Sequence, residues 1–225
     1  SPAFHVIRAA ESVDECCERV SFPCVAKPLS LSASRGVIRC ESRDELFSAI
    51  ARIRQMLFAE TLDGEQAILV EEYLPGNEYS VEALLHDSQL EILAIFEKPD
   101  PMTGPFFEET IYVTPPQLDT PTLASIKTTL NTMAVALEFR EGPLHAEVRI
   151  SEGGIFFIEV ASRTIGGRCG KVIKFLTGAS LETWVLANAV RQSITPRETS
   201  DAFGVMMIPV SQAGVLRRVE GITNA

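Results

Sequence analysis

Two glutamates in a regular hairpin pattern have the types and spacing that chemistry needs. In LHAEVRISEGGIFFIEVASR, Glu147 falls in the first predicted strand and Glu159 in the second. Side chains alternate between the two faces of a strand, so Glu147 shares a face with His145 and Arg149. A three-residue loop, 152–154, would put Glu147 directly across from Glu159 on that face. A two-residue loop would put them on opposite faces.

Two carboxylates that face each other at this separation repel, so one must take up a proton or a cation must lie between them. Hard oxygen ligands suit Mg²⁺, which completes its shell with water and phosphate oxygens. The same spacing places Phe157 on the face of Glu159. The alternative is a solvated edge hairpin with two surface glutamates, and the spacing alone leaves both open.

A second candidate group is PCVAKPLSLSASRGV, where a lysine ends a predicted strand and a loop of small residues follows. Lys27 and a loop that holds Ser34, Arg35 and Gly36 could surround phosphates with an ammonium and backbone N–H groups. The segment contains neither GxxxxGK[ST] nor GxGxxG. An exposed strand lysine with no such role is the open alternative.

The third group is AILVEEYLPGNE, residues 67–78. Its apolar strand continues into Glu71, Glu72, Tyr73 and Leu74, whose edge backbone groups could meet a planar base. An acid further along could accept ribose hydroxyls. A core strand with exposed acids explains the same letters, so the segment needs its context.

Composition narrows the class of protein. The chain has 225 residues, of which 46% are apolar and 22% charged, as in ordinary globular proteins. Its formal charge of -10 argues against a broad nucleic-acid-binding face. No apolar run has the length of a membrane span, and the first residues form no signal peptide. We therefore expect neither nucleic acid nor membrane as a partner, and a cytoplasmic protein whose five cysteines are reduced and mostly packing.

Helical and strand patterns alternate without a strict βαβ order, which favours an α+β fold over a doubly wound sheet. A capping box predicts a short helix at 12–19, and Thr120 or Thr122 is the expected cap of a longer one. Amphipathic spacing predicts helices at 44–57, 121–139 and 181–194. Strands are predicted at 24–27, 37–40, 67–73, 79–86, 90–98, 110–114, 144–150, 155–161 and 203–210.

Taken in order, the three groups resemble the ATP-grasp superfamily. The chain looks like its carboxylate–amine ligases, specifically the L-amino-acid (dipeptide) ligases, and more distantly like biotin carboxylase. The resemblance is carried by FPCVAKP with SASRGV, LVEEYLPGNEYSVEAL, FFEETIYVTPPQL, GPLHAEVRI and FIEVASRTIGG. It implies two α+β lobes with ATP between them, a small lobe at 1–74 and a larger one at 75–225.

The resemblance also implies ATP and Mg²⁺ (or Mn²⁺) as cofactors. Lys27 would bind the phosphates, under a mobile loop that includes 34–36. Glu71 would meet the adenine amino group, the backbone of 72–74 the ring nitrogens, and Glu78 a ribose hydroxyl. The implied nucleotide-binding residues are Lys27, Ser34, Arg35, Gly36, Glu71, Glu72, Tyr73, Leu74 and Glu78.

For catalysis, the resemblance implies small-molecule carboxylate and amine substrates joined through an acyl phosphate. Glu147 and Glu159 would hold the magnesium ions, with Glu159 bridging them. Arg163 would stabilise the acyl phosphate and the tetrahedral intermediate, and Glu109 would approach the amino group of the substrate.

Two departures from the family pattern matter. Many members have Asn at the position of Ala161, so the shell of a second metal ion is less defined here. The family also has an N-terminal lobe and an upstream phosphate-binding lysine, so we expect this chain to be the ATP-grasp portion of a longer protein. Two alternatives stay open: a nucleotide-binding regulatory module without catalysis, and a bicarbonate-activating enzyme similar to biotin carboxylase or carbamoyl-phosphate enzymes.

Overall fold

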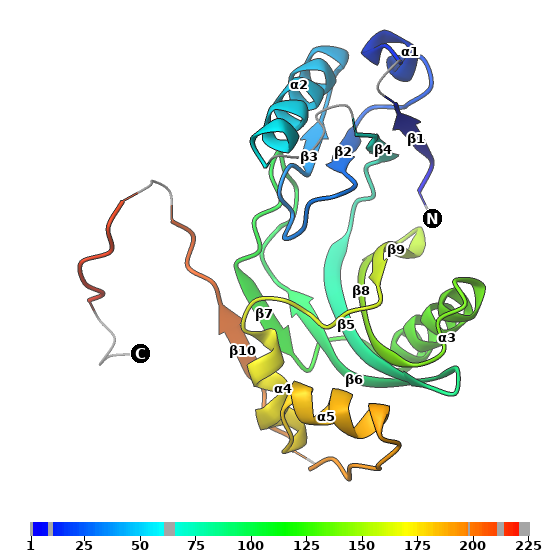
Figure 1. The fold of residues 1–225 in the computed structure, drawn as a ribbon, viewed down its shortest axis with the longest axis vertical. Helices are drawn as coiled ribbons and strands as arrows, with labels where there is room; N and C mark the ends of the chain where they lie inside the picture. Colours follow the sequence, from blue (N-terminus) through cyan, green and yellow to red (C-terminus); the bar gives the residue numbers. More distant parts are fainter. Residues whose placement is uncertain (1, 9–10, 61–65, 198, 211–213, 221–225) are drawn as a thin grey trace.

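Two antiparallel sheets organise the chain (Figure 1). The computed structural model describes residues 2–8, 11–60, 66–197, 199–210 and 214–220. The four-stranded sheet has the order β1 (Phe4–Ile7), β4 (Ile68–Glu72), β2 (Cys24–Pro28), β3 (Ile38–Cys40). The six-stranded sheet has the order β10 (Phe203–Met206), β7 (Ile111–Thr114), β6 (Gln89–Lys98), β5 (Asn77–His86), β8 (Gly142–Ser151), β9 (Gly154–Ala161). The predicted α+β class is confirmed.

The small sheet is covered by two helices, α1 (Val13–Cys17) and α2 (Arg43–Ala59). The predicted capping box of Ser12 and Glu15 starts α1. The apolar stripe of α2 packs on β2 and β3, and its buried residues are Leu46, Ala49, Ile50, Ile53 and Leu57. All five cysteines are free thiols and four of them are buried, which agrees with a packing role.

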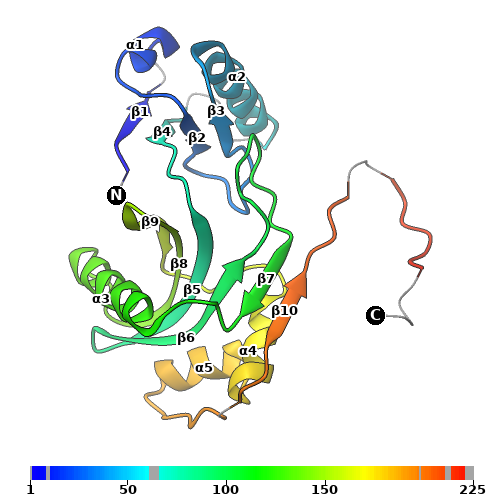
Figure 2. The ribbon, with the colours of Figure 1, turned by 180° about the vertical axis from the view of Figure 1, so that it is seen from behind.

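The larger sheet has a helical layer on each face (Figures 1 and 2). Ile126 and Leu130 of α3 (Thr120–Ala136) share a core with Val81 and Val148. Residues of the opposite face, such as Leu84, pack with α4 (Cys169–Thr177) and α5 (Leu181–Ala189). These two helices cover only part of that face, and its polar part faces the small lobe. Among the described residues, none of the helices has the length and apolar character that a bilayer crossing needs.

The two sheets have separate cores, and the chain passes between them at 73–76, where the sequence predicts the lobes to divide. One small cluster joins the lobes, because Val25 of β2 packs with Met102 and Phe107 from the loop after β6. In the same loop the carbonyl of Pro105 accepts a hydrogen bond from the Arg39 N–H at 2.9 Å. The loop after β6 therefore fixes how the lobes face each other.

Several predicted boundaries are wrong. Asp119, not a threonine, caps α3, and its carboxylate accepts the Thr122 N–H at 2.9 Å. Helix α5 ends at Ala189, not at 194 as predicted, and strand β10 ends at Met206, not at 210. The sequence also misses β1, a short edge strand, and α4, whose N-cap residue Arg168 makes no side-chain capping bond that would mark a helix start.

Gly76, in the segment between the lobes, provides a test of that connection. It adopts a φ of 121°, and an added Cβ would lie 2.3 Å from the Ile150 carbonyl oxygen. Gly142 is also in the left-handed region, with a φ of 98°, but nothing lies within 4 Å of its added Cβ. We expect Gly76→Ala to lower the free energy of unfolding by about 2–4 kcal/mol and Gly142→Ala by about 1 kcal/mol, measured by urea denaturation. Equal losses would show that the contact with Ile150 does not restrain this segment.

Candidate active site

Glu147 and Glu159 are partners across the β8–β9 pair, but not by the predicted route. The loop between the strands holds two residues, 152–153, instead of three. That loop would place the two glutamates on opposite faces. The register shifts between Glu147 and Val148, which makes Ile158 an extra residue on β9. This β-bulge restores the pairing of the two carboxylates.

The bulge also changes the faces of the neighbouring side chains. Phe157 does not lie on the face of Glu159, as the simple alternation predicts, but is buried in the core with α3. Ile158 instead lines the pocket together with Glu159. The insertion of Ile158 thus directs two side chains into the same pocket, the carboxylate of Glu159 and the apolar side chain of Ile158 itself.

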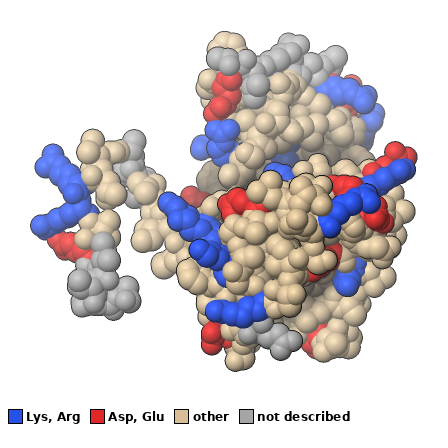
Figure 3. Space-filling view, turned by 60° about the horizontal axis from the view of Figure 1, so that its bottom comes forward, with Lys and Arg blue, Asp and Glu red and all other residues tan. Residues whose placement is uncertain are grey.

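Ten of the thirteen predicted site residues line one pocket between the lobes. Figure 3 shows the surface hollowed between the lobes, with both acidic and basic side chains beside the hollow. The ten are Lys27, Ser34, Arg35, Glu71, Glu72, Tyr73, Leu74, Glu78, Glu147 and Glu159. The other three are Gly36, Glu109 and Arg163, which lie beside this lining.

The loop after β2 forms one wall of the pocket. Residues 31–35 and Val37 line it. Gly36 does not, and its φ of 78° turns the chain back toward β2, where an added Cβ would lie 3.1 Å from Pro28. Arg35 pairs with Glu60 at the end of α2 at 2.6 Å. In this arrangement the Arg35 guanidinium is held by the small lobe's own helix.

Lys27 and Glu71 form an ion pair across β2 and β4. Both side chains are mostly buried and line the pocket, so the ammonium is held at the pocket wall by a carboxylate. An anion that enters the pocket meets a lysine whose side chain is already ordered, which lowers the entropic cost of binding.

The end of β4 offers fewer free backbone donors than the sequence suggests. The Glu72 N–H donates to the Ala3 carbonyl at 2.9 Å, and the Tyr73 N–H donates to the Pro23 carbonyl at 3.1 Å. The Leu74 N–H makes no hydrogen bond with any residue the structure describes. Leu74 is therefore the backbone donor of this segment that a ligand can use.

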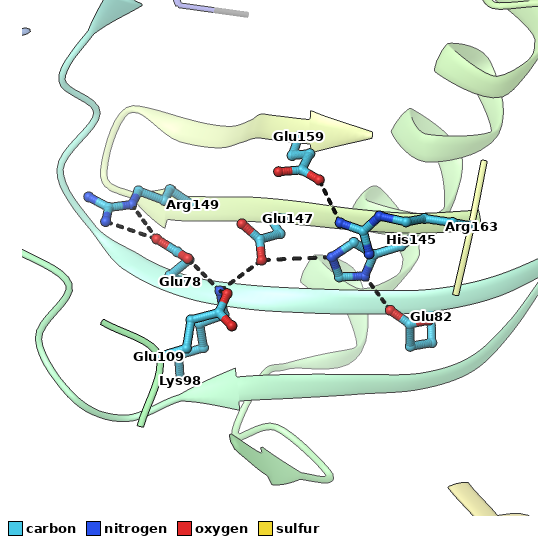
Figure 4. Close-up of polar contacts among 9 residues, drawn as sticks. All are labelled: Glu78, Glu82, Lys98, Glu109, His145, Glu147, Arg149, Glu159 and Arg163. Carbon is cyan, nitrogen blue, oxygen red and sulfur yellow. Dashed lines mark hydrogen bonds and ion pairs between the residues drawn. The ribbon is translucent and has the colours of Figure 1, made fainter. Parts of the chain in front are cut away.

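Lys98, which the sequence analysis missed, lies at the centre of the polar face of the larger sheet (Figure 4). Its side chain is 2% exposed, and Nζ lies 2.7 Å from Glu78 Oε1, 2.9 Å from Glu147 Oε1 and 3.3 Å from Glu109 Oε1. Lys98 and Glu78 are cross-strand partners on β6 and β5. Only the register of the sheet reveals this, because in sequence Lys98 precedes a Pro-rich loop like any surface lysine.

Arg149 is the second buried cation of this face. Its Nε and Nη2 donate to Glu78 Oε2, each at 2.9 Å. It also donates to the carbonyls of Leu74 at 2.8 Å and Met102 at 2.6 Å. Lys98 and Arg149 thus engage both oxygens of Glu78, the residue predicted to meet the ribose. Arg149 also ties this carboxylate to the segment between the lobes.

Glu147 stays ionised because of its neighbours. Burial raises the pKa of its carboxyl, but Lys98 and His145 lower the pKa more strongly and bring it well below its usual range. Burial lowers the pKa of His145, whereas the neighbouring carboxylates of Glu147 and Glu82 raise it to about 9. Lys98 at 2.9 Å and His145 Nε2 at 3.7 Å both approach Oε1 of Glu147. Oε2 remains available on the pocket side.

The two predicted catalytic residues touch this group from its edge (Figure 4). Arg163 pairs with Glu159 Oε1 at 2.9 Å, and both side chains are about half-exposed. Glu109 is within 3.3 Å of Lys98. Arg163 thus contacts a residue of the pocket lining directly, and Glu109 reaches the lining residues Glu78 and Glu147 through Lys98.

The donor set fits a hard divalent cation. Glu147 Oε2 and Glu159 Oε2 belong to partner residues on adjacent strands, and in both carboxylates the cationic contacts are made by the other oxygen. Carboxylate oxygens are ligands that Mg²⁺ prefers, with water and phosphate in the remaining positions. The residues therefore fit a magnesium ion with two protein ligands.

Comparison with known proteins assigns the fold. A sequence profile for the ATP-grasp domain matches residues 20–172, more than half of the chain. The chain belongs to the ATP-grasp family. Most of the motifs that carry the sequence resemblance lie on or next to β2, β4, β8 and β9, which contribute residues to the pocket, and the predicted ATP-grasp fold is confirmed.

This ATP-grasp chain is similar to three proteins of known name. A crystal structure of an L-amino acid ligase from Bacillus licheniformis is 28% identical with a TM-score of 0.77, covering 100% of this chain and 53% of that one. A D-alanine–D-alanine ligase from Thermotoga petrophila is 33% identical over 78 residues, 35% of this chain and 23% of that protein. Biotin carboxylase from Campylobacter jejuni shares the fold, with 18% identity and a TM-score of 0.64 over 79% of this chain and 39% of that one. The chain thus spans about half the length of the L-amino acid ligase.

Replacing Lys98 tests the charge balance of the site. In Lys98→Met, Glu78 and Glu147 would remain buried together without the ammonium, so we expect a loss of about 3–5 kcal/mol of unfolding free energy at pH 7. The depressed pKa of Glu147 stabilises the fold above its unfolded pKa of about 4.3, and this contribution is lost as the pH falls through the folded value. The difference between wild type and variant should therefore shrink below about pH 4.

Urea denaturation at pH 7 and at about pH 3 measures both effects. Lys127→Met, at an exposed position of α3, is the matched control and should change stability by less than about 0.5 kcal/mol. A loss below about 1 kcal/mol in Lys98→Met at pH 7 would contradict the role given to Lys98.

Proposed function

We propose that the chain is the ATP-binding module of a carboxylate–amine ligase, which activates a carboxylate as an acyl phosphate and couples it to an amine. The observation that carries the proposal is the facing pair Glu147 and Glu159 in a pocket that also contains Lys27. Paired carboxylates and a lysine around one cavity match the needs of a metal-bound triphosphate. Membership in the ATP-grasp family supports the same conclusion.

Part of the pocket is suited to bind the adenine base. Val25, Leu74, Phe107 and Ile158 give it apolar walls from both lobes. The free Leu74 N–H can donate to a ring nitrogen at the pocket edge. Glu78 lines the same pocket, where a ribose hydroxyl could reach it. Glu71 would accept a hydrogen bond from the adenine amino group either while it stays paired with Lys27 or after that ion pair breaks.

Phosphates would lie between Lys27 and the paired glutamates, with the loop around Ser34 and Arg35 closing over them. Glu147 and Glu159 would hold Mg²⁺, which when bound neutralises charge on the phosphate oxygens. In the reaction we propose, a substrate carboxylate oxygen attacks the γ-phosphorus and the bond to ADP breaks. An amine nitrogen then attacks the acyl carbon, loses a proton, and inorganic phosphate leaves.

Arg163 and Glu109 would serve this reaction at the rim of the pocket. The Arg163 guanidinium, next to Glu159, would stabilise negative charge on the acyl phosphate and the tetrahedral intermediate. Glu109 would approach the attacking amine. The L-amino acid ligase and the D-alanine–D-alanine ligase are named for amino acid substrates, so we propose amino acids as carboxylate and amine.

One observation favours a second candidate. Ala161 supplies no ligand atom beyond the two glutamates. A module that binds nucleotide and regulates a partner without turnover fits this observation. A bicarbonate-activating reaction is a further alternative because the fold is shared with biotin carboxylase.

Nucleotide binding by the chain itself is the first test. We expect calorimetric titration with ATP to show Mg²⁺-dependent binding, weakened about tenfold or more in Glu159→Ala because a metal ligand is lost. Glu152→Ala is the matched control, since Glu152 is an exposed acid in the turn of the same hairpin. Equal affinity in Glu159→Ala and wild type would remove the metal assignment.

Turnover is the second test and uses the full-length gene product. With ATP, Mg²⁺ and a panel of amino acids, phosphate release should require an amino acid pair and fall about 100-fold or more in Glu159→Ala. Release that depends on bicarbonate would favour the carboxylase-like alternative. Tight nucleotide binding with no release under any condition would favour the regulatory module.

A further inference from the structure

Glu82, near the middle of β5, is a buried carboxylate that the proposed reaction does not use. It is 2% exposed, and both of its oxygens are engaged. Oε1 pairs with Nδ1 of His145, and Oε2 accepts the Ile165 N–H at 2.9 Å. A buried charge is costly unless it is paired in this way, so its two contacts define what it does. It joins strand β8 to the loop that follows β9.

The first contact leads to the metal-binding carboxylate. Glu82 and His145 are cross-strand partners, and His145 lies two residues before Glu147 on the same face. The other ring nitrogen, Nε2, is 3.7 Å from Glu147 Oε1. The two ring nitrogens thus face two different carboxylates, so one imidazole ring lies between Glu82 and Glu147 and fixes their separation.

The second contact leads to the loop that carries Arg163. Ile165 follows Arg163 by two residues, and Arg163 is itself tied to Glu159 at 2.9 Å. The loop is thus held by an exposed ion pair to Glu159 and by a part-buried hydrogen bond to Glu82. The exposed pair contributes little rigidity. The hydrogen bond to the buried carboxylate of Glu82 is the stronger constraint on where the loop starts its path toward α4.

We propose that Glu82 and His145 are positioning residues that couple the Arg163 loop to the carboxylate of Glu147. The functional role of this coupling rests on the proposed function, in which Glu147 would hold the metal ion and Arg163 would bind the acyl phosphate. Figure 4 shows the continuous line of contacts from Glu82 through His145 to Glu147, with Arg163 above it. Neither Glu82 nor His145 lines the pocket, so they act through their neighbours.

Two variants of Glu82 separate coupling from packing. Glu82→Leu removes both contacts, whereas Glu82→Gln keeps an oxygen for the Ile165 N–H and an amide N–H that Nδ1 of a neutral imidazole accepts, with Nε2–H still directed at Glu147. In Glu82→Leu we expect faster hydrogen exchange of the Ile165 amide. We also expect about 10–100-fold weaker Mn²⁺ binding in the presence of ADP, read by electron paramagnetic resonance. Glu82→Gln should keep both within about threefold of wild type.

A matched control removes buried hydrogen bonds elsewhere in the same lobe. The Thr177 hydroxyl accepts from the Trp184 Nε1–H at 2.8 Å and donates to the Ile173 carbonyl at 2.8 Å. Thr177→Val should lower thermal stability without changing Mn²⁺ affinity or the exchange of Ile165. Mn²⁺ affinity within twofold of wild type in Glu82→Leu would overturn the proposal and leave Glu82 as a packing element.

A substitution at Glu147, with its effect read at Ile165, tests the coupling separately from the proposed function. A coupling is reciprocal, so Glu147→Ala should speed the exchange of the Ile165 amide about threefold or more in protein without nucleotide or metal. Unchanged exchange there would overturn the coupling whatever the protein binds. Wild-type protein that binds neither ADP nor Mn²⁺, with the exchange effect present, would instead reject the ligase proposal and keep the coupling.

Discussion

The ammonium of Lys98, held among three carboxylates inside a β-sheet, is the interaction on which the site depends. Glu78 and Glu147 occupy adjacent strands of a buried face, where two ionised acids cannot coexist without a cation. Lys98 provides that cation from the third strand, 2.7 Å and 2.9 Å away. Because Lys98 binds one oxygen of Glu147, it leaves the other oxygen for a ligand. The same contact therefore balances the charge of Glu147 and orients its carboxylate.

This charge balance extends to the way the lobes meet. Arg149 completes the pairing of Glu78 and at the same time binds the carbonyls of Leu74 and Met102. Leu74 lies between the two sheets, and Met102 belongs to the loop that packs against Val25 of the small lobe. A buried guanidinium with several fixed partners loses little freedom when a ligand arrives. The same network thus shapes the pocket beside Leu74 and beside Glu147.

The sequence predicts most of the fold and the pocket lining, because these follow from local periodicity and from motifs read in order. It fails where the outcome depends on register. The bulge at Ile158 has no glycine or proline to mark it, yet it decides that Glu159 faces Glu147 and that Phe157 enters the core. Lys98 becomes a central residue only once β5 and β6 are aligned. Helix α4 lacks a capping side chain, so no start signal exists in its sequence.

Ala161 connects the departure from the family pattern to the local packing. On β9 Ala161 is the cross-strand partner of His145, so a side chain without a ligand atom faces the imidazole. A methyl group leaves the ring room to lie between Glu82 and Glu147, and it contributes no competing donor or acceptor to either carboxylate. The small side chain of Ala161 therefore has two consequences. It offers no ligand atom to a metal ion, and it leaves space in which His145 contacts Glu147. The metal ion that this site suits is one that takes two carboxylates from the protein and draws its other ligands from phosphate and water.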